Sequence, residues 1–143
     1  MARAFFRDGY NCCQSVLLAF QDLIDLPQDK IASLSSGFGG GMGRLREVCG
    51  AVSAMTFLSG VISPAVHPDR LEERTKNYAI VQELAGKFRE EHGSIVCREI
   101  LNIRAGQKES PQPSVRTAEF YTKRPCERLI GSAARIVAEY LDK

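Results

Sequence analysis

Residues 37–54 read GFGGGMGRLREVCGAVSA, and the rest of the chain is interpreted outward from them. Five of the seven residues from Gly37 to Gly43 are glycine. Glycine costs roughly 0.5–1 kcal/mol relative to alanine inside a helix or strand, so this run predicts a loop. The glycines there would serve close backbone approach or positive φ. Arg44 and Arg46 make the loop basic, and it delivers Cys49 to a helix start.

The segment that follows the loop carries no charged residue from Val48 to Val66. Small and apolar residues recur in it at three- and four-residue spacing until Pro64: Gly50, Ala51, Ala54, Met55, Leu58, Val61 and Ile62. This spacing predicts a short buried helix over about 49–63, at the centre of the fold. Its glycines, serines and Pro64 are untypical of a membrane span, so we expect no membrane insertion.

Helical periodicity continues through the remainder of the chain. Residues 2–7 are expected to form a frayed opening turn. Further helices are predicted at about 11–24, 27–34, 70–91, 94–101 and 125–141, starting at Asn11, Pro27, Asp69, Ser94 and Pro125. The apolar face of the helix at 70–91 is predicted to consist of Leu71, Tyr78, Val81, Leu84 and Phe88. We find neither strand alternation nor an internal repeat. The sequence therefore predicts an all-α fold, in which residues 1–143 form one bundle of five or six helices around the central helix. Gly106, Pro111 and Pro113 predict a mobile loop at about 104–117.

The composition narrows the functional classes. The 143 residues carry a formal net charge of +2, and no basic stripe with interleaved aromatic residues occurs, so we expect no nucleic-acid partner. The N-terminal region lacks the apolar segment of a secretory signal, which favours a cytoplasmic protein. In that compartment the five cysteines would be reduced thiols, better suited to reactivity or metal binding than to a disulfide framework.

Four of the cysteines share one kind of position. Cys12, Cys49, Cys97 and Cys126 each fall in the first turn of a predicted helix. Unpaired N–H groups and about half a positive charge at a helix N-terminus stabilise a thiolate. We therefore hypothesise that the four helix starts converge on one electropositive pocket. Cys49 has the strongest activating features, because the glycine loop, Arg44 and Arg46 lie close to it in sequence.

The glycine loop is also a candidate anion- or cofactor-binding segment, through Gly39, Gly40, Gly41, Gly43 and Arg44. It follows a helix and fits no nucleotide-binding motif, so no particular cofactor is indicated. His67 and His92 are expected to be solvated surface residues without a catalytic role.

Other interpretations of the cysteines stay open. Cysteine is also a small buried hydrophobe, and all four positions fit the apolar face of a helix, as does Cys13. No C-x-x-C occurs, so the spacing predicts no metal ligand set. The four thiolates could nevertheless form a zinc or iron–sulfur site in three dimensions. A purely structural helical protein is the third alternative.

Several short motifs together resemble a known family. They are Gly9-Tyr10-Asn11-Cys12, Cys49-Gly50-Ala51, Cys97-Arg98-Glu99 and Pro125-Cys126. In order and spacing they are similar to the redox-active four-cysteine family with the CGAxxG motif, the C-GCAxxG-C-C family. The resemblance implies a small bacterial or archaeal cytoplasmic protein of thiol redox chemistry, with an unestablished substrate. The family cysteines fall on Cys12, Cys49, Cys97 and Cys126.

The sequence departs from the family motif at Ala54, where the motif has its final glycine. We expect this side chain to be buried against a neighbouring helix. The leading hypothesis is a thiol-disulfide oxidoreductase in which Cys49 attacks or is oxidised first and Cys12, Cys97 or Cys126 resolves it as a disulfide. Its partner would be a redox protein or a small-molecule substrate, and the sequence leaves a homodimer open.

Overall fold

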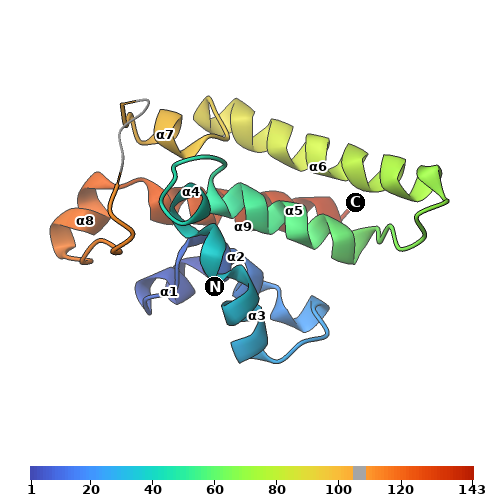
Figure 1. Ribbon diagram of the computed structural model, residues 1–143, viewed down its shortest axis with the longest axis horizontal. Helices are drawn as coiled ribbons and strands as arrows, with labels where there is room; N and C mark the ends of the chain where they lie inside the picture. The colour runs from blue at the N-terminus through green and yellow to red at the C-terminus, as the bar shows by residue number, and fades with distance from the viewer. Residues whose placement is uncertain (105–108) are drawn as a thin grey trace.

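The computed structural model describes residues 1–104 and 109–143, apart from the side chains of residues 122 and 123. The described residues form helices and no named strand, which confirms the all-α prediction (Figure 1). One isolated antiparallel bridge joins Val48 to Val96. The α-helices are α1 (Ala2–Arg7), α2 (Cys12–Ala19), α3 (Gln28–Ser35), α4 (Gly39–Met42), α5 (Gly50–Ile62), α6 (Leu71–His92), α7 (Cys97–Ile100), α8 (Ala118–Lys123) and α9 (Cys126–Leu141).

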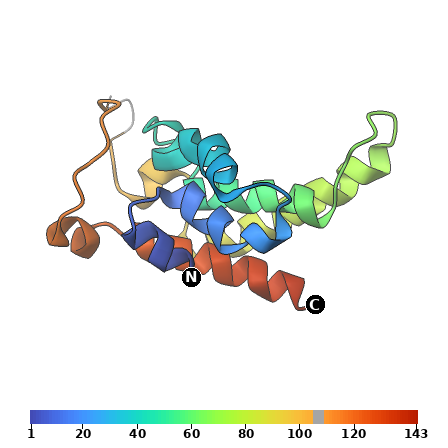
Figure 2. The same ribbon diagram turned by 90° about the horizontal axis from the view of Figure 1, so that it is seen from below.

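Helix α5 is the central element, as predicted. It packs against α2, α6 and α9. Its core-facing side chains are almost completely buried, among them Ala51, Ala54, Met55 and Leu58. The expected burial of Ala54 is thereby confirmed. Helices α5, α6 and α9 extend along the long axis of the molecule, with α1, α2 and α3 on one side of them (Figures 1 and 2).

Helix α2 begins where the sequence predicts and ends earlier. The Asn11 side chain accepts a hydrogen bond from the Gln14 N–H at 3.0 Å, and the Gln14 side chain accepts one from the Asn11 N–H at 2.9 Å. This reciprocal capping box satisfies two of the N–H groups that a helix start leaves unpaired. The α-helix stops at Ala19, and a 3₁₀ turn over Gln21–Leu23 replaces the rest of the predicted helix.

The apolar face of α6 differs from the predicted one. Leu71 and Tyr78 were expected to face inward, but both are exposed, while Ile80, Leu84 and Phe88 are buried. The N-cap is Arg70 rather than Asp69. The first turns of α6 lie at the end of the molecule away from α7 and α8 (Figure 1), and the buried residues of this helix begin only at Ile80.

The predicted loop at 104–117 is only partly described. Residues 105–108 lie outside the described residues, and 109–117 contain no helix or strand. Helix α8, capped by the Thr117 side chain, follows this segment and was not predicted. Helix α1 is a regular helix where a frayed turn was expected. Helix α4 is a distorted turn within the glycine loop, in which Gly40 and Gly41 have φ of +68° and +69°, the positive φ expected for this loop. In the part of the chain that the structure covers, no helix has the length and apolar character required to cross a membrane.

Candidate functional site

Cys12, Cys49, Cys97 and Cys126 line one small cavity of about 40 Å³, which we call the thiol cavity. Its walls also include Gly40, Arg46, Gly50, Ile100, Leu101 and Leu129. A water molecule occupies roughly 30 Å³ in the liquid, so the space between the sulfurs is small. Cys13 lies outside this cavity and is 2 % exposed. The structure thus brings together the four helix starts that the sequence singles out.

Backbone hydrogen bonds hold two of these helix starts side by side. The Cys49 N–H donates to the Ile95 carbonyl at 2.8 Å, and the Cys97 N–H donates to the Glu47 carbonyl at 2.6 Å. These bonds flank the antiparallel bridge between Val48 and Val96. The starts of α5 and α7 are therefore fixed to each other through main-chain atoms, independently of the cysteine side chains.

Two glycines make room for the cysteines. A Cβ added to Gly50 would collide with the Cys12 sulfur and would approach the Phe38 carbonyl oxygen to 2.8 Å. A Cβ added to Gly41 would lie 2.8 Å from the Cys97 Cβ, and Gly41 has a φ of +69°. Both glycines are needed because a cysteine lies directly against their backbone. For Gly41 the close approach and the positive φ are those expected of the glycine loop.

The glycine loop uses much of its own hydrogen-bonding capacity. The Gly43 N–H donates to the Gly37 carbonyl and the Glu47 N–H to the Gly41 carbonyl, each at 2.9 Å. The backbone N–H of Gly40 favours the charged form of Cys12 and so lowers the pKa of that thiol. These N–H groups therefore hold the loop and act on a thiol. Among the candidate binding residues, Gly39, Gly40, Gly43 and Arg44 line a second cavity, while Gly41 is buried and lines neither that cavity nor the thiol cavity.

The pKa of Cys49 is raised, whereas its position at a helix start led us to expect a lowered pKa. Cys49 is 5 % exposed, and burial raises the pKa of its thiol, to which nearby Cys12 adds. The N–H groups of Ala51 and Val52 at the start of α5 lower the pKa without reversing this rise. A helix terminus contributes typically about 0.3–1 kcal/mol, whereas burial can shift a pKa by about 3–5 units. Desolvation outweighs the helix start.

The other pKa values follow the same balance. Burial raises the pKa of Cys12, and the N–H of Gly40 opposes that rise. Burial raises the pKa of Cys126 to about 11, opposed by the guanidiniums of Arg124 and Arg46. Of these three thiols, Cys126 is the one whose charged form is favoured by guanidiniums.

The cysteine to which Arg46 donates a hydrogen bond is Cys97 rather than Cys49. Its side chain is 8 % exposed, with Nη1 donating to the Cys97 sulfur at 3.5 Å and Nε donating to Glu109 at 2.6 Å. Arg44 donates to the Ser114 hydroxyl at 3.0 Å and pairs with Glu109 at 3.3 Å. Both arginines were expected to act on Cys49 because they are close to it in sequence. This expectation is wrong, because their partners come from segments 51 to 70 residues away.

A wider cavity of about 250 Å³ adjoins the thiol cavity, and we call it the vestibule. Cys12 and Cys126 line both cavities, whereas Cys49 and Cys97 line only the thiol cavity. The vestibule walls include Arg44, Arg46, Arg116 and Arg124. Sequence reasoning missed Glu109, Arg116 and Arg124, because they belong to or follow an irregular segment in which no periodicity indicates where side chains point.

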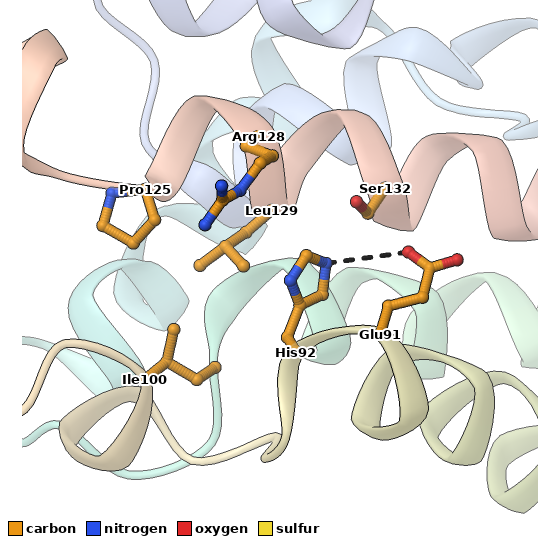
Figure 3. Close-up of a pocket in the computed structure, with 7 residues that line it drawn as sticks. All are labelled: Glu91, His92, Ile100, Pro125, Arg128, Leu129 and Ser132. Atoms are coloured by element: carbon orange, nitrogen blue, oxygen red, sulfur yellow. Dashed lines mark ion pairs between the residues drawn. The ribbon is translucent and has the colours of Figure 1, made fainter.

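A third cavity, of about 500 Å³, lies between the end of α6, α7 and the start of α9 (Figure 3). Ile100 and Leu129 line both this cavity and the thiol cavity, and no cysteine lines the larger one. There His92 faces Arg128 and Leu129 of α9. The His92 side chain is only 10 % exposed, and the centre of its ring lies 4.7 Å from that of Phe88 at an interplanar angle of 50°. Burial lowers its pKa, so the expectation that His92 is a solvated surface residue is wrong. His67 is exposed, as expected, and pairs with Glu73.

The four sulfurs do not form a metal-binding group. Within residues 1–104 and 109–143, no three His, Cys, Asp or Glu side chains are arranged to hold a metal ion. All five cysteines are free.

The chain matches one protein-family model. The family is described as "Putative redox-active protein (C_GCAxxG_C_C)", and the match covers residues 10–140. No curated protein and no solved structure matches the chain.

Proposed function

Because the chain belongs to the redox-active C_GCAxxG_C_C family, we propose that it is a thiol-disulfide redox protein in which Cys126 meets the substrate and Cys12 resolves the mixed disulfide. The observation that carries this proposal is that Cys12 and Cys126 alone among the five cysteines line both the vestibule and the thiol cavity. A substrate in the vestibule reaches these two sulfurs first. Free thiols persist in a reducing compartment, so we propose the cytoplasm as its location.

The exchange proceeds in two steps. The Cys126 thiolate attacks one sulfur of a disulfide substrate, a new S–S bond forms, and the other half of the substrate leaves as a thiolate. The Cys12 thiolate then attacks the Cys126 sulfur and releases the second half. The protein loses two electrons and two protons and holds a Cys12–Cys126 disulfide, while the substrate is reduced to two thiols.

Cys49 and Cys97 take a different part. They line the inner cavity only, and Arg46 donates to the Cys97 sulfur. We propose that these two accept the disulfide from the outer pair by a further exchange. This role replaces direct attack by Cys49, because Cys49 is buried and does not line the vestibule.

Cys126 is the preferred attacking thiol for electrostatic reasons. Arg124 and Arg46 favour its thiolate, and both line the vestibule with it. Cys12 has no such guanidinium among the causes that shift its pKa, and its sulfur lies against Gly50.

We expect reduced protein treated with 2,2′-dithiodipyridine to release two thiopyridones per internal disulfide formed, followed by absorbance. Cys126→Ser should slow the first release to the rate of the remaining thiols. Cys12→Ser should release one thiopyridone and retain the other on Cys126, which peptide mass spectrometry after acid quenching locates.

Cys13→Ser provides the matched control, since Cys13 neighbours Cys12 in sequence and lines neither cavity. It should release both thiopyridones as the parent protein does. Equal first-release rates in Cys126→Ser and the parent protein would exclude Cys126 as the attacking thiol.

A further inference from the structure

We infer that the vestibule selects a small anionic substrate, a disulfide that carries carboxylates, and that Arg44, Arg116 and Arg124 bind those carboxylates. This inference rests on the proposed function and adds the class of substrate.

The vestibule has a strong excess of positive charge. Four guanidiniums line it, from Arg44, Arg46, Arg116 and Arg124, and no acidic side chain of the described chain does. Among the described residues, the carboxylate that pairs with these guanidiniums is Glu109, which contacts Arg44 and Arg46. A single negative charge opposite four positive ones leaves the cavity electropositive, which raises the local concentration of an anion.

Arg116 and Arg124 have no carboxylate partner among the described residues. Arg116 donates to the Phe6 carbonyl and, at 2.8 Å, to the Tyr10 carbonyl, and its guanidinium stacks 4.1 Å from the centre of the Phe6 ring. These contacts fix its position. Arg124 lies 5.9 Å from the centre of the Phe120 ring. Guanidiniums held on aromatic rings remain able to bind carboxylates.

Arg44 carries an unused donor. Its Nε is buried and has no hydrogen-bond partner, although its other nitrogens contact Ser114 and Glu109. A buried charged donor without an acceptor is costly. Because this Nε is buried, a ligand in the vestibule would meet the rest of the guanidinium, and the Arg44 side chain is 20 % exposed.

The size and walls of the vestibule limit the rest of the substrate. Its volume of about 250 Å³ is just below the range of about 300–1,000 Å³ that is usual for small-molecule pockets. Phe6, Phe120, Pro111 and Pro113 supply apolar walls beside the arginines. Cys12 and Cys126 lie in the same cavity. A compact molecule with an apolar or sulfur-containing centre and terminal carboxylates fits this combination.

The test compares two probe disulfides with the reduced full-length protein. One is 5,5′-dithiobis(2-nitrobenzoate), which carries two carboxylates, and the other is the neutral 2,2′-dithiodipyridine. The measured quantity is the ratio of their second-order rate constants for Cys126. This ratio cancels any change in the thiolate fraction of Cys126, which matters because Arg124 also acts on that thiol.

We expect Arg124→Gln and Arg44→Gln each to lower the ratio about tenfold, the loss expected for one charge-assisted contact. Glu109→Gln should raise the ratio, because it removes the competing carboxylate. In the parent protein, raising the salt from 0.1 to 1 M shortens the Debye length from about 10 to about 3 Å and should lower the ratio.

Arg135→Gln is the matched control. Arg135 has the same charge, lies on α9 and lines neither the vestibule nor the thiol cavity. Suppose that the ratio is unchanged in Arg124→Gln, Arg44→Gln and Glu109→Gln, and that the neutral probe still forms the Cys12–Cys126 disulfide. That result overturns the proposal of an anionic substrate and leaves the proposed function standing. Failure of the neutral probe to form that disulfide overturns the proposed function instead.

Discussion

At the scale of single residues, burial and close contact determine what each cysteine can do. Cys49, Cys12 and Cys126 all occupy helix starts, and burial still raises the pKa of each thiol. The difference among them is exposure to the vestibule and to guanidiniums. A sequence reveals the helix starts, but it does not reveal which thiol faces Arg124.

Gly50 offers a direct test at this scale. We expect Gly50→Ala to displace the Cys12 sulfur and to destabilise the protein by about 1–3 kcal/mol, as overpacking does. Thermal unfolding and the rate of the second thiopyridone release measure the two effects.

Gly60→Ala is its matched control, because the same change falls in the same helix where an added Cβ meets nothing within 4 Å. It should stabilise the protein by roughly 0.5–1 kcal/mol. If both variants melt alike, the contact between Gly50 and Cys12 does not constrain the site.

At the scale of the elements, α5 organises the fold through its small residues. Gly50 faces Cys12 and Cys13 of α2, and Ala54 lies one turn further along the same side. The family motif has a glycine at the position of Ala54, and in this protein the alanine side chain is fully buried within the packing of α5.

We expect Ala54→Leu to lower the free energy of unfolding by about 1–3 kcal/mol, because a buried position has no room for the larger side chain. Thermal or urea unfolding measures the change. Thr56→Leu, on the exposed side of the same helix, should leave stability nearly unchanged. An Ala54→Leu protein as stable as Thr56→Leu would contradict the central position of α5.

The elements that the sequence predicts well are those with local signals. Asn11 with Gln14, Pro125 before Cys126, and the uncharged run after Cys49 each mark a helix start within the chain itself. Predictions failed where a distant segment decides. The buried face of α6 depends on what covers it, and the position of Arg46 depends on Glu109, 63 residues away.

At the scale of the whole molecule, the buried thiols link stability to pH. Burial raises the pKa of Cys13 to about 12 and of Cys126 to about 11. An unfolded thiol titrates near about 8.5. Between these values the unfolded chain loses its protons while the folded protein keeps them, so the folded state loses stability as the pH rises.

We therefore expect the melting temperature to fall from about pH 9 upward. Each such thiol should lower the free energy of unfolding by up to about 1.4 kcal/mol per pH unit. Calorimetry at pH 7, 9 and 10 measures it. Cys13→Ala removes one of the thiols and should make the decline shallower. Parallel declines in the two proteins would show that Cys13 keeps no raised pKa in the folded state.

The main-chain bonds between Glu47 or Cys49 and the segment at 95–97 have a consequence for how long the protein survives. The helical hairpin of α5 and α6 lies between the two joined segments, so a Cys49–Cys97 disulfide would close a loop of about 48 residues. Closing a loop of that size removes roughly 4 kcal/mol of unfolded-chain entropy. Proteases cut chains that open. Proteases would therefore degrade the oxidised form more slowly than the reduced form. The amount of this protein in a cell would then depend on how much of it had recently been oxidised.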